Sequence, residues 1–238
     1  MITDRFNMTI EDNIFTAKRL LVDSVYQQAN LEGIAVTYAQ TQDILNNVNV
    51  SNLSPKDISK VCCLRDGWKY FFDNLNEPLD LIYLKELHEI VARFDVDYRY
   101  LGKIRTNQVL ISGTTWKPGL PDEDKLFRYL DSIEYIDRCI TNTALKTGLK
   151  IMRMQPFQDG NKRIGSFVIN KILVSHGRGI FNVPVELDGT FKEKLVRYYE
   201  SDEPTEFAKW IRENCLFGTN EIINDKPAAD RFSPDIVR

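Results

Sequence analysis

The chain has 238 residues, of which 43% are hydrophobic and 27% are charged, and its formal net charge is −3. This composition is typical of a soluble globular protein, and the small negative charge excludes a general attraction to nucleic acid or to anionic membranes. No apolar run approaches the ~20 residues that span a bilayer, and the N-terminus lacks the features of a secretory signal. Four cysteines without a CxxC pair and two histidines form no zinc pattern, so we expect reduced thiols and a cytoplasmic location.

Apolar residues at helical spacing predict helices along the first hundred residues. Residues 12–31 are predicted to form one helix, and a short helix is expected over 38–48. Ser54 and Pro55 mark the start of a helix that runs to about residue 75, because serine caps a helix and proline fits its first turn. The apolar stripe of the next predicted helix consists of Leu84, Leu87, Val91 and Phe94.

The segment 101–120 has a different pattern. Ile104, Val109 and Ile111 alternate with polar residues, and glycines and prolines interrupt the stretch, which predicts a small β-hairpin. Helical spacing then returns in two stripes, namely Leu126, Leu130, Ile133, Ile136 and Ile140, followed by Leu145, Leu149 and Met152. Residues 164–174 are apolar nearly all round and should form a buried central helix. The predicted fold class is therefore all-α or mainly α, a helical bundle with one hairpin.

The stretch that carries chemistry lies directly before this buried helix and reads QPFQDGNKR, from Gln155 to Arg163. Gly160 lets the backbone approach a ligand closely, and the turn leads into a helix N-terminus, where free amides favour phosphate. Lys162 and Arg163 add positive charge at the same place, and Asp159 supplies an oxygen ligand suited to Mg²⁺. These residues predict a phosphate site, and an ordinary surface turn is the alternative.

The same stretch resembles the motif HPFx[D/E]GN[G/K]R of the Fic family and differs from it only at Gln155, where the family has its catalytic histidine. The resemblance extends over roughly residues 10–215 and implies a Fic-type helical fold. It implies ATP or another nucleoside triphosphate, with Mg²⁺ on Asp159, and a target protein with a Ser, Thr or Tyr hydroxyl; a homodimer is left open. The implied nucleotide-binding residues are Phe157, Asp159, Gly160, Asn161, Lys162 and Arg163.

Two further segments carry the resemblance. Residues 102–105 and 109–115 look like the flap of the family, which docks the target segment by strand addition through backbone pairing. The flap residues are Val109, Ile111, Ser112, Gly113, Thr114 and Thr115. Glu32 resembles the glutamate of the inhibitory motif [S/T]xxxE[G/N], with Gln28 at the Ser/Thr position, and in the family it obstructs the γ-phosphate. A glutamate that simply ends a helix in solvent is the alternative. The predicted regions are an N-terminal inhibitory helix region (1–50), a Fic domain (51–215) and a C-terminal tail (216–238).

Two departures from the family pattern bear on catalysis. Gln155 cannot act as the general base, because its amide does not titrate near neutral pH, and losing a positioned base typically costs ~10²–10⁴ in rate. His88 and His176 are expected to have packing roles and not to replace it. Ser166 stands where adenylylating members carry an arginine, and Lys162 replaces their second glycine. This combination is more like the Doc toxins, which phosphorylate with the nucleotide reversed.

Two functions from different classes therefore stand side by side. The first is a transferase that passes AMP or a phosphoryl group to a protein hydroxyl, with catalysis weakened at Gln155. The second is a catalytically inactive module that holds a nucleotide and docks a partner through the flap, in a regulatory or toxin–antitoxin-related role. The retained DGNKR residues favour a nucleotide site in both cases.

Overall fold

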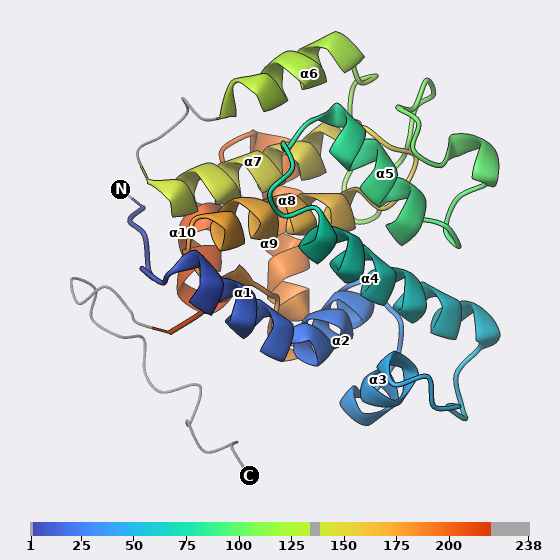
Figure 1. Ribbon diagram of the computed structural model, residues 1–238. Coiled ribbons are helices and arrows are strands. Elements are labelled where there is room, and N and C mark those ends of the chain that lie inside the picture. The colour runs from blue at the N-terminus through green and yellow to red at the C-terminus, as the bar shows by residue number, and fades with distance from the viewer. Residues whose placement is uncertain (1, 134–138, 220–238) are drawn as a thin grey trace.

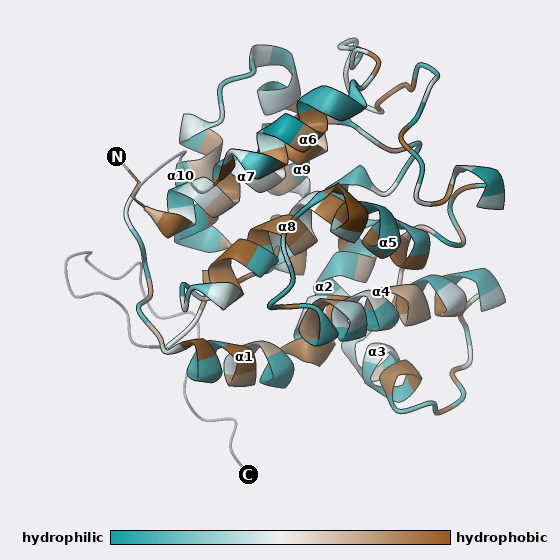
Figure 2. Cartoon of the chain, turned by 45° about the horizontal axis from the view of Figure 1, so that its top comes forward, coloured by the Kyte–Doolittle hydropathy of each residue, from teal (hydrophilic) through white to brown (hydrophobic). Residues whose placement is uncertain are grey.

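The computed structural model describes residues 2–133 and 139–219, and helix α8 (Asn161–Ser175) lies at its centre (Figure 1). Thirteen of the 15 residues of α8 are buried, as the apolar run in the sequence predicts. In Figure 2, α8 is mostly hydrophobic in colour, whereas the outer face of α6 (Glu123–Asp131) is hydrophilic. The surrounding helices therefore cover α8 with their apolar faces and leave their polar faces outside.

Helix α7 (Ile140–Met154) runs beside α8 at unusually short range. A Cβ atom added at Gly148 would lie 2.6 Å from the Gly165 carbonyl oxygen, and one added at Gly165 would lie 2.7 Å from the Gly148 carbonyl oxygen. Because no side chain fits at either position, the two glycines allow direct contact between the helix backbones. This contact holds α7 and α8 together, and the predicted phosphate site lies at the turn that joins them.

The N-terminal part of the described chain forms helices of which the first and fifth contact α8, and each of them except the second begins at a polar side-chain cap. They are α1 (Ile10–Arg19), α2 (Leu21–Leu31), α3 (Tyr38–Leu45), α4 (Pro55–Asp73) and α5 (Leu81–Val91). Ser54 caps α4 by accepting from the Asp57 amide, as predicted, and Thr37 forms a capping box with Gln40 at the start of α3.

The prediction of one helix over 12–31 is wrong, because the chain breaks at Leu20 into α1 and α2. Helix α1 packs on α8, whereas α2 packs on α3 and α4, and one straight helix would not serve both contacts. The predicted helix over 38–48 ends earlier, at Leu45. Phe94 lies beyond the end of α5 with 45% of its surface exposed, so it does not belong to the buried stripe of that helix.

The remaining helical elements of the described chain lie after α5. They are η1 (Tyr98–Tyr100), α6, η3 (Val185–Leu187), α9 (Asp188–Ser201) and α10 (Thr205–Asn214). Two short strands, β1 (Ile180–Phe181) and β2 (Leu216–Phe217), pair antiparallel. The fold class is therefore confirmed as helical with one small two-stranded sheet, and the first two residues of the predicted tail belong to that sheet. Ile136 and residues 220–238 lie outside the described residues.

The predicted position of the strands is wrong. Residues 101–120 contain no strand and form an irregular loop, and the sheet lies at β1 and β2 instead. A hairpin ladder is replaced here by the guanidinium of Arg105, which bonds to main-chain carbonyls at both ends of the loop, at Asn107 and Gly119. Prolines at 118 and 121 also lack the N–H donors that a ladder needs.

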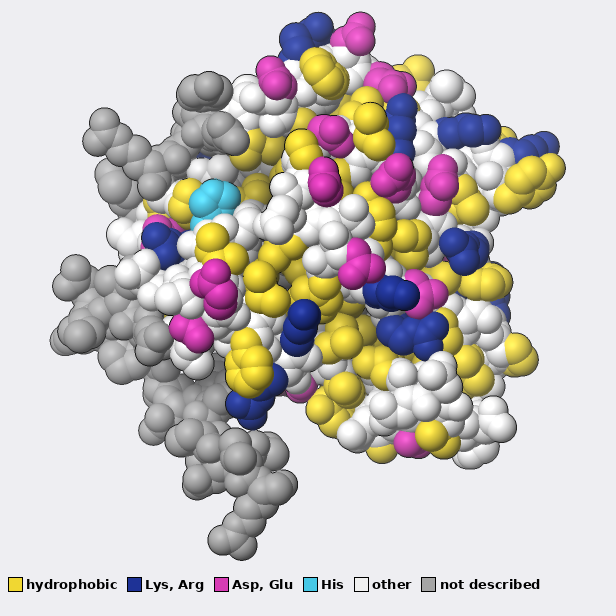
Figure 3. Space-filling view, viewed as in Figure 1, with side chains coloured by type: hydrophobic (Ala, Val, Ile, Leu, Met, Phe, Trp, Pro, Cys, Tyr) yellow, Lys and Arg dark blue, Asp and Glu magenta, His cyan; other side chains and the backbone are white. Residues whose placement is uncertain are grey.

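The surface carries both signs of charge, as expected from the small net charge of the chain. Acidic, basic and hydrophobic side chains are interspersed over the face seen in Figure 3. Across residues 2–133 and 139–219, no helix has both the length and the apolar character needed to cross a membrane.

Candidate functional site

The motif turn joins the end of α7 to the start of α8 and depends on two residues with positive φ. Gln155 ends α7 in the left-handed region at φ 48° and ψ 56°, and Gly160 precedes α8 at φ 78°. Gly160 offers no side-chain acceptor to the first turn of α8. The first amides of α8 therefore receive no side-chain cap from Gly160, and such amides at a helix N-terminus favour an anion. The phosphate site stays a prediction.

Asn161 holds this turn together with its side chain. Its Oδ1 accepts from the Phe157 amide at 2.9 Å, while its Nδ2 donates to the Phe157 carbonyl at 2.9 Å and to Gln155 Oε1 at 2.8 Å. The side chain is thus fully engaged within the turn. A contribution of Asn161 to phosphate binding would have to come from its backbone amide.

His88 and Phe157 form the floor of the turn. The Phe157 ring is fully buried and stacks on the His88 ring at a centroid distance of 4.0 Å. His88 Nδ1 accepts from the Gly102 amide at 3.0 Å, so Nε2 carries the proton and donates to the Asp159 carbonyl at 3.0 Å. Burial lowers the pKa of His88 from 6.5 to about 4. With both nitrogens engaged, His88 cannot serve as a base for position 155.

The other histidine is remote from the turn. His176 follows the last residue of α8 and its Nδ1 lies 2.8 Å from the Ile172 carbonyl oxygen. At 1.5 Å per residue, the 15 residues of α8 separate it from the turn by roughly 22 Å. The packing and helix-end roles expected for both histidines agree with these contacts.

The side chain of Gln155 is directed into the end of α7. Its Nε2 donates to the Met152 carbonyl at 2.6 Å and lies 3.5 Å from the Tyr199 hydroxyl, and its Oε1 accepts from Asn161. The amide therefore acts as a helix cap, and because an amide does not titrate near neutral pH, it cannot take a substrate proton.

Glu32 lies between the two cations of the motif. It follows α2 directly, and its carboxylate is 3.3 Å from Lys162 Nζ and 3.4 Å from Arg163 Nε. Only 16% of the Glu32 side chain is exposed, so the alternative of a glutamate in open solvent does not describe it. Lys162 Nζ also donates to the Leu31 carbonyl at 3.3 Å, which fixes the end of α2 on α8. The carboxylate sits where the charge of the motif would otherwise attract phosphate.

Asp95 is a second acidic partner of Arg163 that the sequence did not indicate. It bonds to Arg163 Nη1, which also donates to the Val91 carbonyl, and it pairs with Lys60 Nζ at 2.6 Å. Burial raises the pKa of Asp95, but the Arg163 charge and the bond from Lys60 outweigh it, so the pKa is below its ordinary value. Arg163 is 5% exposed and is anchored independently of Glu32. The turn after α5 gives no local signal of this long-range pair.

Asp159 is the most accessible member of the motif. Its side chain is 60% exposed, it accepts from the Gly160 amide at 2.6 Å, and it lies 4.0 Å from Arg163 Nη2. Among the described residues, no group of three or more His, Cys, Asp or Glu side chains could hold a metal ion alone. A single accessible carboxylate nevertheless suits Mg²⁺, which proteins often bind through one carboxylate plus substrate phosphates. The magnesium prediction for Asp159 therefore stays a prediction.

The predicted flap lies over α9. Thr114 Oγ1 donates to Glu200 Oε1 at 2.6 Å. Trp116 stacks on Tyr199 at 5.6 Å, and the Arg153 guanidinium lies 4.8 Å from the centre of the indole ring. The flap is thus anchored to both α9 and the end of α7.

The side chains of the flap alternate even though its backbone forms no ladder. Val109 and Ile111 are partly buried, whereas Leu110 between them is 82% exposed. Ser112, Gly113 and Thr115 are also exposed, and Thr114 is partly buried. The alternation in the sequence therefore corresponds to side chains that face alternately toward the protein and toward solvent. The backbone of this segment is not paired with a neighbouring strand, so an incoming strand could pair with it.

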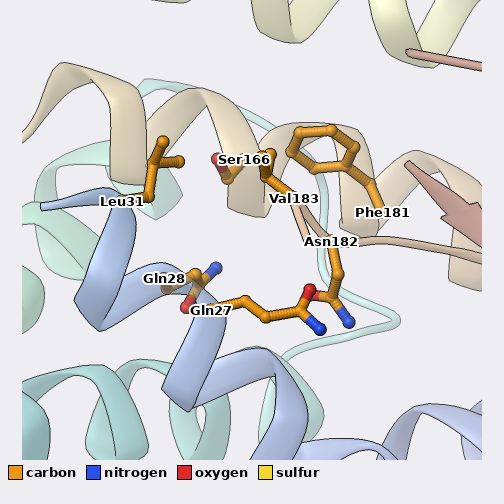
Figure 4. Close-up of a pocket in the computed structure, with 7 residues that line it drawn as sticks. All are labelled: Gln27, Gln28, Leu31, Ser166, Phe181, Asn182 and Val183. Carbon is orange, nitrogen blue, oxygen red and sulfur yellow. The ribbon is translucent and has the colours of Figure 1, made fainter. Parts of the chain in front are cut away.

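Gln28 and Ser166, which both differ from the residues that the family has at these positions, line a small hollow between α2 and α8. Figure 4 shows Gln28 from α2 and Ser166 from α8 at this hollow, whose other lining residues are Gln27, Leu31, Phe181, Asn182 and Val183. It has about 10 Å³ of interior space for water, which is room for about one water molecule, so the hollow is too small for a nucleotide. Gln28 Oε1 accepts from Trp68 Nε1 at 3.0 Å, so this glutamine has a structural role.

The chain is similar in sequence and in fold to known Fic proteins. Residues 78–173 match the Fic/DOC family model, and the chain contains a Fic/DOC family domain. The chain is 27% identical over 238 residues to the protein adenylyltransferase Fic of Aedes aegypti, covering 92% of this chain and 47% of that protein. It is 27% identical over 189 residues to the protein of the same name from Drosophila melanogaster, covering 76% and 37%. The chain thus spans less than half the length of these curated relatives.

Two solved structures share the fold. A Fic domain containing signaling protein from Bacteroides thetaiotaomicron superposes with a TM-score of 0.71 at 19% identity, covering 86% of each chain. Fic-1 from C. elegans superposes with a TM-score of 0.67 at 18% identity, covering 85% of this chain and 62% of the other. These similarities extend the fold beyond the residues that the family model matches, to most of the chain.

Proposed function

We propose that this chain binds a magnesium nucleotide at the N-terminus of α8 and that Glu32 closes the site in its resting form. The observation that carries the proposal is the carboxylate of Glu32, held 3.3 Å from Lys162 Nζ and 3.4 Å from Arg163 Nε. An anion thus already occupies the place where cations and helix amides meet. A nucleotide phosphate is the natural competitor for that position, and Asp159 would hold Mg²⁺ beside it.

The proposed reaction is transfer of AMP from ATP to a Ser, Thr or Tyr hydroxyl of a protein, the activity named for the curated relatives. The hydroxyl oxygen attacks the α-phosphorus, pyrophosphate leaves, and a base must take the hydroxyl proton. The side chain of Gln155 cannot take it, because its amide does not titrate near neutral pH and its acceptor is bonded to Asn161. We therefore expect a rate below that of a histidine-bearing enzyme by ~10²–10⁴.

Phosphoryl transfer is the second form of this proposal. Lys162 and Ser166 are the two residues that make the motif more like that of the Doc toxins, in which the nucleotide is reversed. The γ-phosphoryl group would then pass to the hydroxyl, and ADP would leave. Ser166 stands where adenylylating members carry an arginine that binds the γ-phosphate. Its hydroxyl donates to the Lys162 carbonyl at 2.9 Å and supplies no positive charge in place of that arginine.

A binding module is the alternative function. It is favoured by Gln155, whose amide is engaged with Met152 and Asn161 and acts as a structural cap. In that case the nucleotide site and the flap would serve to hold a ligand and to dock a partner protein in a regulatory or toxin–antitoxin-like role. A cytoplasmic location and a homodimer are further predictions of the sequence.

Mass spectrometry after incubation with Mg²⁺ and labelled ATP separates these functions. The proteins to compare are the natural chain, Gln155→His, the double variant Gln155→His with Glu32→Gly, and the control Gln42→His on the exposed face of α3. An AMP adduct in the double variant supports adenylyl transfer, and a phosphate adduct supports the reversed nucleotide. ATP binding without any adduct on itself or on lysate proteins supports the binding module. A folded double variant that binds no ATP refutes the nucleotide site itself.

A further inference from the structure

The base of the flap is fastened to the motif turn by one buried arginine. Arg105 is 3% exposed, and its backbone amide donates to the Pro156 carbonyl at 2.9 Å. Its Nε donates to the Gln155 carbonyl at 2.6 Å. The other guanidinium nitrogens donate to the carbonyls of Asn107 at 2.7 Å and Gly119 at 2.6 Å. One side chain thus joins both limbs of the flap to the peptide units that follow α7.

The chemistry of this contact requires an arginine. Three carbonyls from three separate segments are bonded by three different nitrogens of one planar guanidinium. A lysine ammonium is a single point donor and cannot span them. Across residues 2–133 and 139–219 no carboxylate pairs with Arg105, and burial lowers its pKa. A buried cation that neutralises no acid here serves to hold backbone in place.

The backbone that Arg105 holds is in an unfavourable conformation. Gln155 has φ 48°, a value that residues other than glycine adopt rarely, because Cβ crowds the following carbonyl. The Gln155 and Pro156 carbonyls both accept hydrogen bonds from Arg105, so the orientation of these peptide units depends on the flap. Position 155 is therefore supported from outside its own helix.

A second set of hydrogen bonds, through His88, also connects the base of the flap to the motif turn. Gly102 donates to His88 Nδ1, and His88 Nε2 donates to the Asp159 carbonyl, both at 3.0 Å. Gly102 has φ 65°, in the left-handed region, so its backbone conformation favours glycine. The flap base is thus connected to the turn near its start, through Arg105, and near its end, through His88.

We propose that Arg105 is a positioning residue that transmits the state of the flap to the peptide unit of Gln155. An incoming strand that displaces the flap from α9 moves the carbonyls of Asn107 and Gly119, and the shared guanidinium carries that movement to the Gln155 carbonyl. The inference rests on the proposed function in one respect, namely that position 155 is where the reacting group of the family stands. Docking at the flap would then adjust the reacting position directly.

Amide hydrogen exchange, followed by mass spectrometry without nucleotide, tests this transmission. Thr114→Val removes the bond to Glu200 and loosens the flap; it should raise exchange in residues 155–160 by roughly 10-fold, and the neighbouring exposed Thr115→Val should not. In an Arg105→Lys background, exchange in 155–160 should be raised already, and Thr114→Val should add nothing to it. Arg99→Lys, at an exposed arginine just before the flap, should behave as the natural chain.

Two outcomes would overturn the inference. If Thr114→Val raises exchange in the flap but leaves residues 155–160 unchanged in the natural background, no movement is transmitted, whatever happens to Arg105→Lys. If both variants raise it additively, the transmission does not pass through Arg105. Since the experiment contains no nucleotide, its failure leaves ATP binding untouched, and a failure to bind ATP leaves the exchange result standing.

Discussion

Replacing Glu32 by glutamine should open the nucleotide site. The substitution keeps the size of the side chain and removes the negative charge that faces Lys162 and Arg163. A phosphate that enters the natural site must displace this carboxylate from both cations, whereas a neutral amide competes much less. We therefore expect Glu32→Gln to bind ATP more tightly.

The magnitude follows from the two contacts. At 3.3 Å and an effective dielectric constant of ~20, two unit charges attract by about 5 kcal/mol, and desolvation and side-chain ordering offset most of this. About 1.5–3 kcal/mol is typical of a contact to a charged group measured by mutation. At 1.4 kcal/mol per tenfold change, ATP affinity should rise by roughly 10- to 100-fold. The cost to folding should be small, because Arg163 keeps Asp95 and Lys162 is 29% exposed to water.

Isothermal titration calorimetry with ATP in excess Mg²⁺ measures this change. Glu193→Gln is the matched control, since Glu193 also pairs with an arginine but lies 62% exposed on α9, away from the motif. Its affinity for ATP should equal that of the natural chain. A folded Glu32→Gln protein with unchanged or weaker ATP binding would refute the reasoning, because the carboxylate would then not compete with phosphate.

Three further outcomes are expected. Arg163→Ala should weaken ATP binding in calorimetry through loss of a charged contact of ~1.5–3 kcal/mol, and unchanged affinity would remove Arg163 from the site. The pKa of His88 is lowered to about 4, so the unfolded chain takes up a proton at this histidine below about pH 6.5, before the folded chain does. The free energy of unfolding should therefore fall as the pH falls from about 6.5 to about 4. Urea unfolding across that range should show a flatter pH dependence for His88→Gln but not for His176→Gln. Trp116→Ala should free the flap, seen as faster tryptic cleavage within residues 101–120, whereas Phe127→Ala at an exposed position on α6 should not; equal cleavage in both would contradict the anchoring contacts.

The features that could be predicted from the sequence are those encoded locally. The start of α4 at Ser54 and Pro55, the buried α8 and the turn before it depend on neighbouring residues, and each was predicted correctly. The charge of Lys162 and Arg163 at a helix N-terminus also follows from adjacent positions. Glu32 was identified through its resemblance to an inhibitory motif, and the structure places it against these cations.

The features that could not be predicted depend on distant contacts. Asp95 meets Arg163 from 68 residues away, and neither residue has a neighbour that signals the pair. The expected hairpin was wrong because alternation records which side chains face inward, and it does not show whether a ladder or a guanidinium holds the backbone. Two-residue strands such as β1 and β2 are too short for a periodic signal. His88 was expected to pack, and its hydrogen bonds to two separate loops became visible only in the structure.

The glycine pair between α7 and α8 has a consequence for the width of the site. Gln155 follows α7 and the amides of the proposed phosphate site begin α8, so the distance between the two helices is the distance that the turn must span. At Gly148 and Gly165 a Cβ atom would lie 2.6 Å and 2.7 Å from the carbonyl oxygen of the other glycine, so a side chain at either position would push the helices apart. The glycine pair therefore determines this distance. Alanine at either position would increase the distance between residue 155 and the N-terminus of α8 without changing any residue of the proposed site.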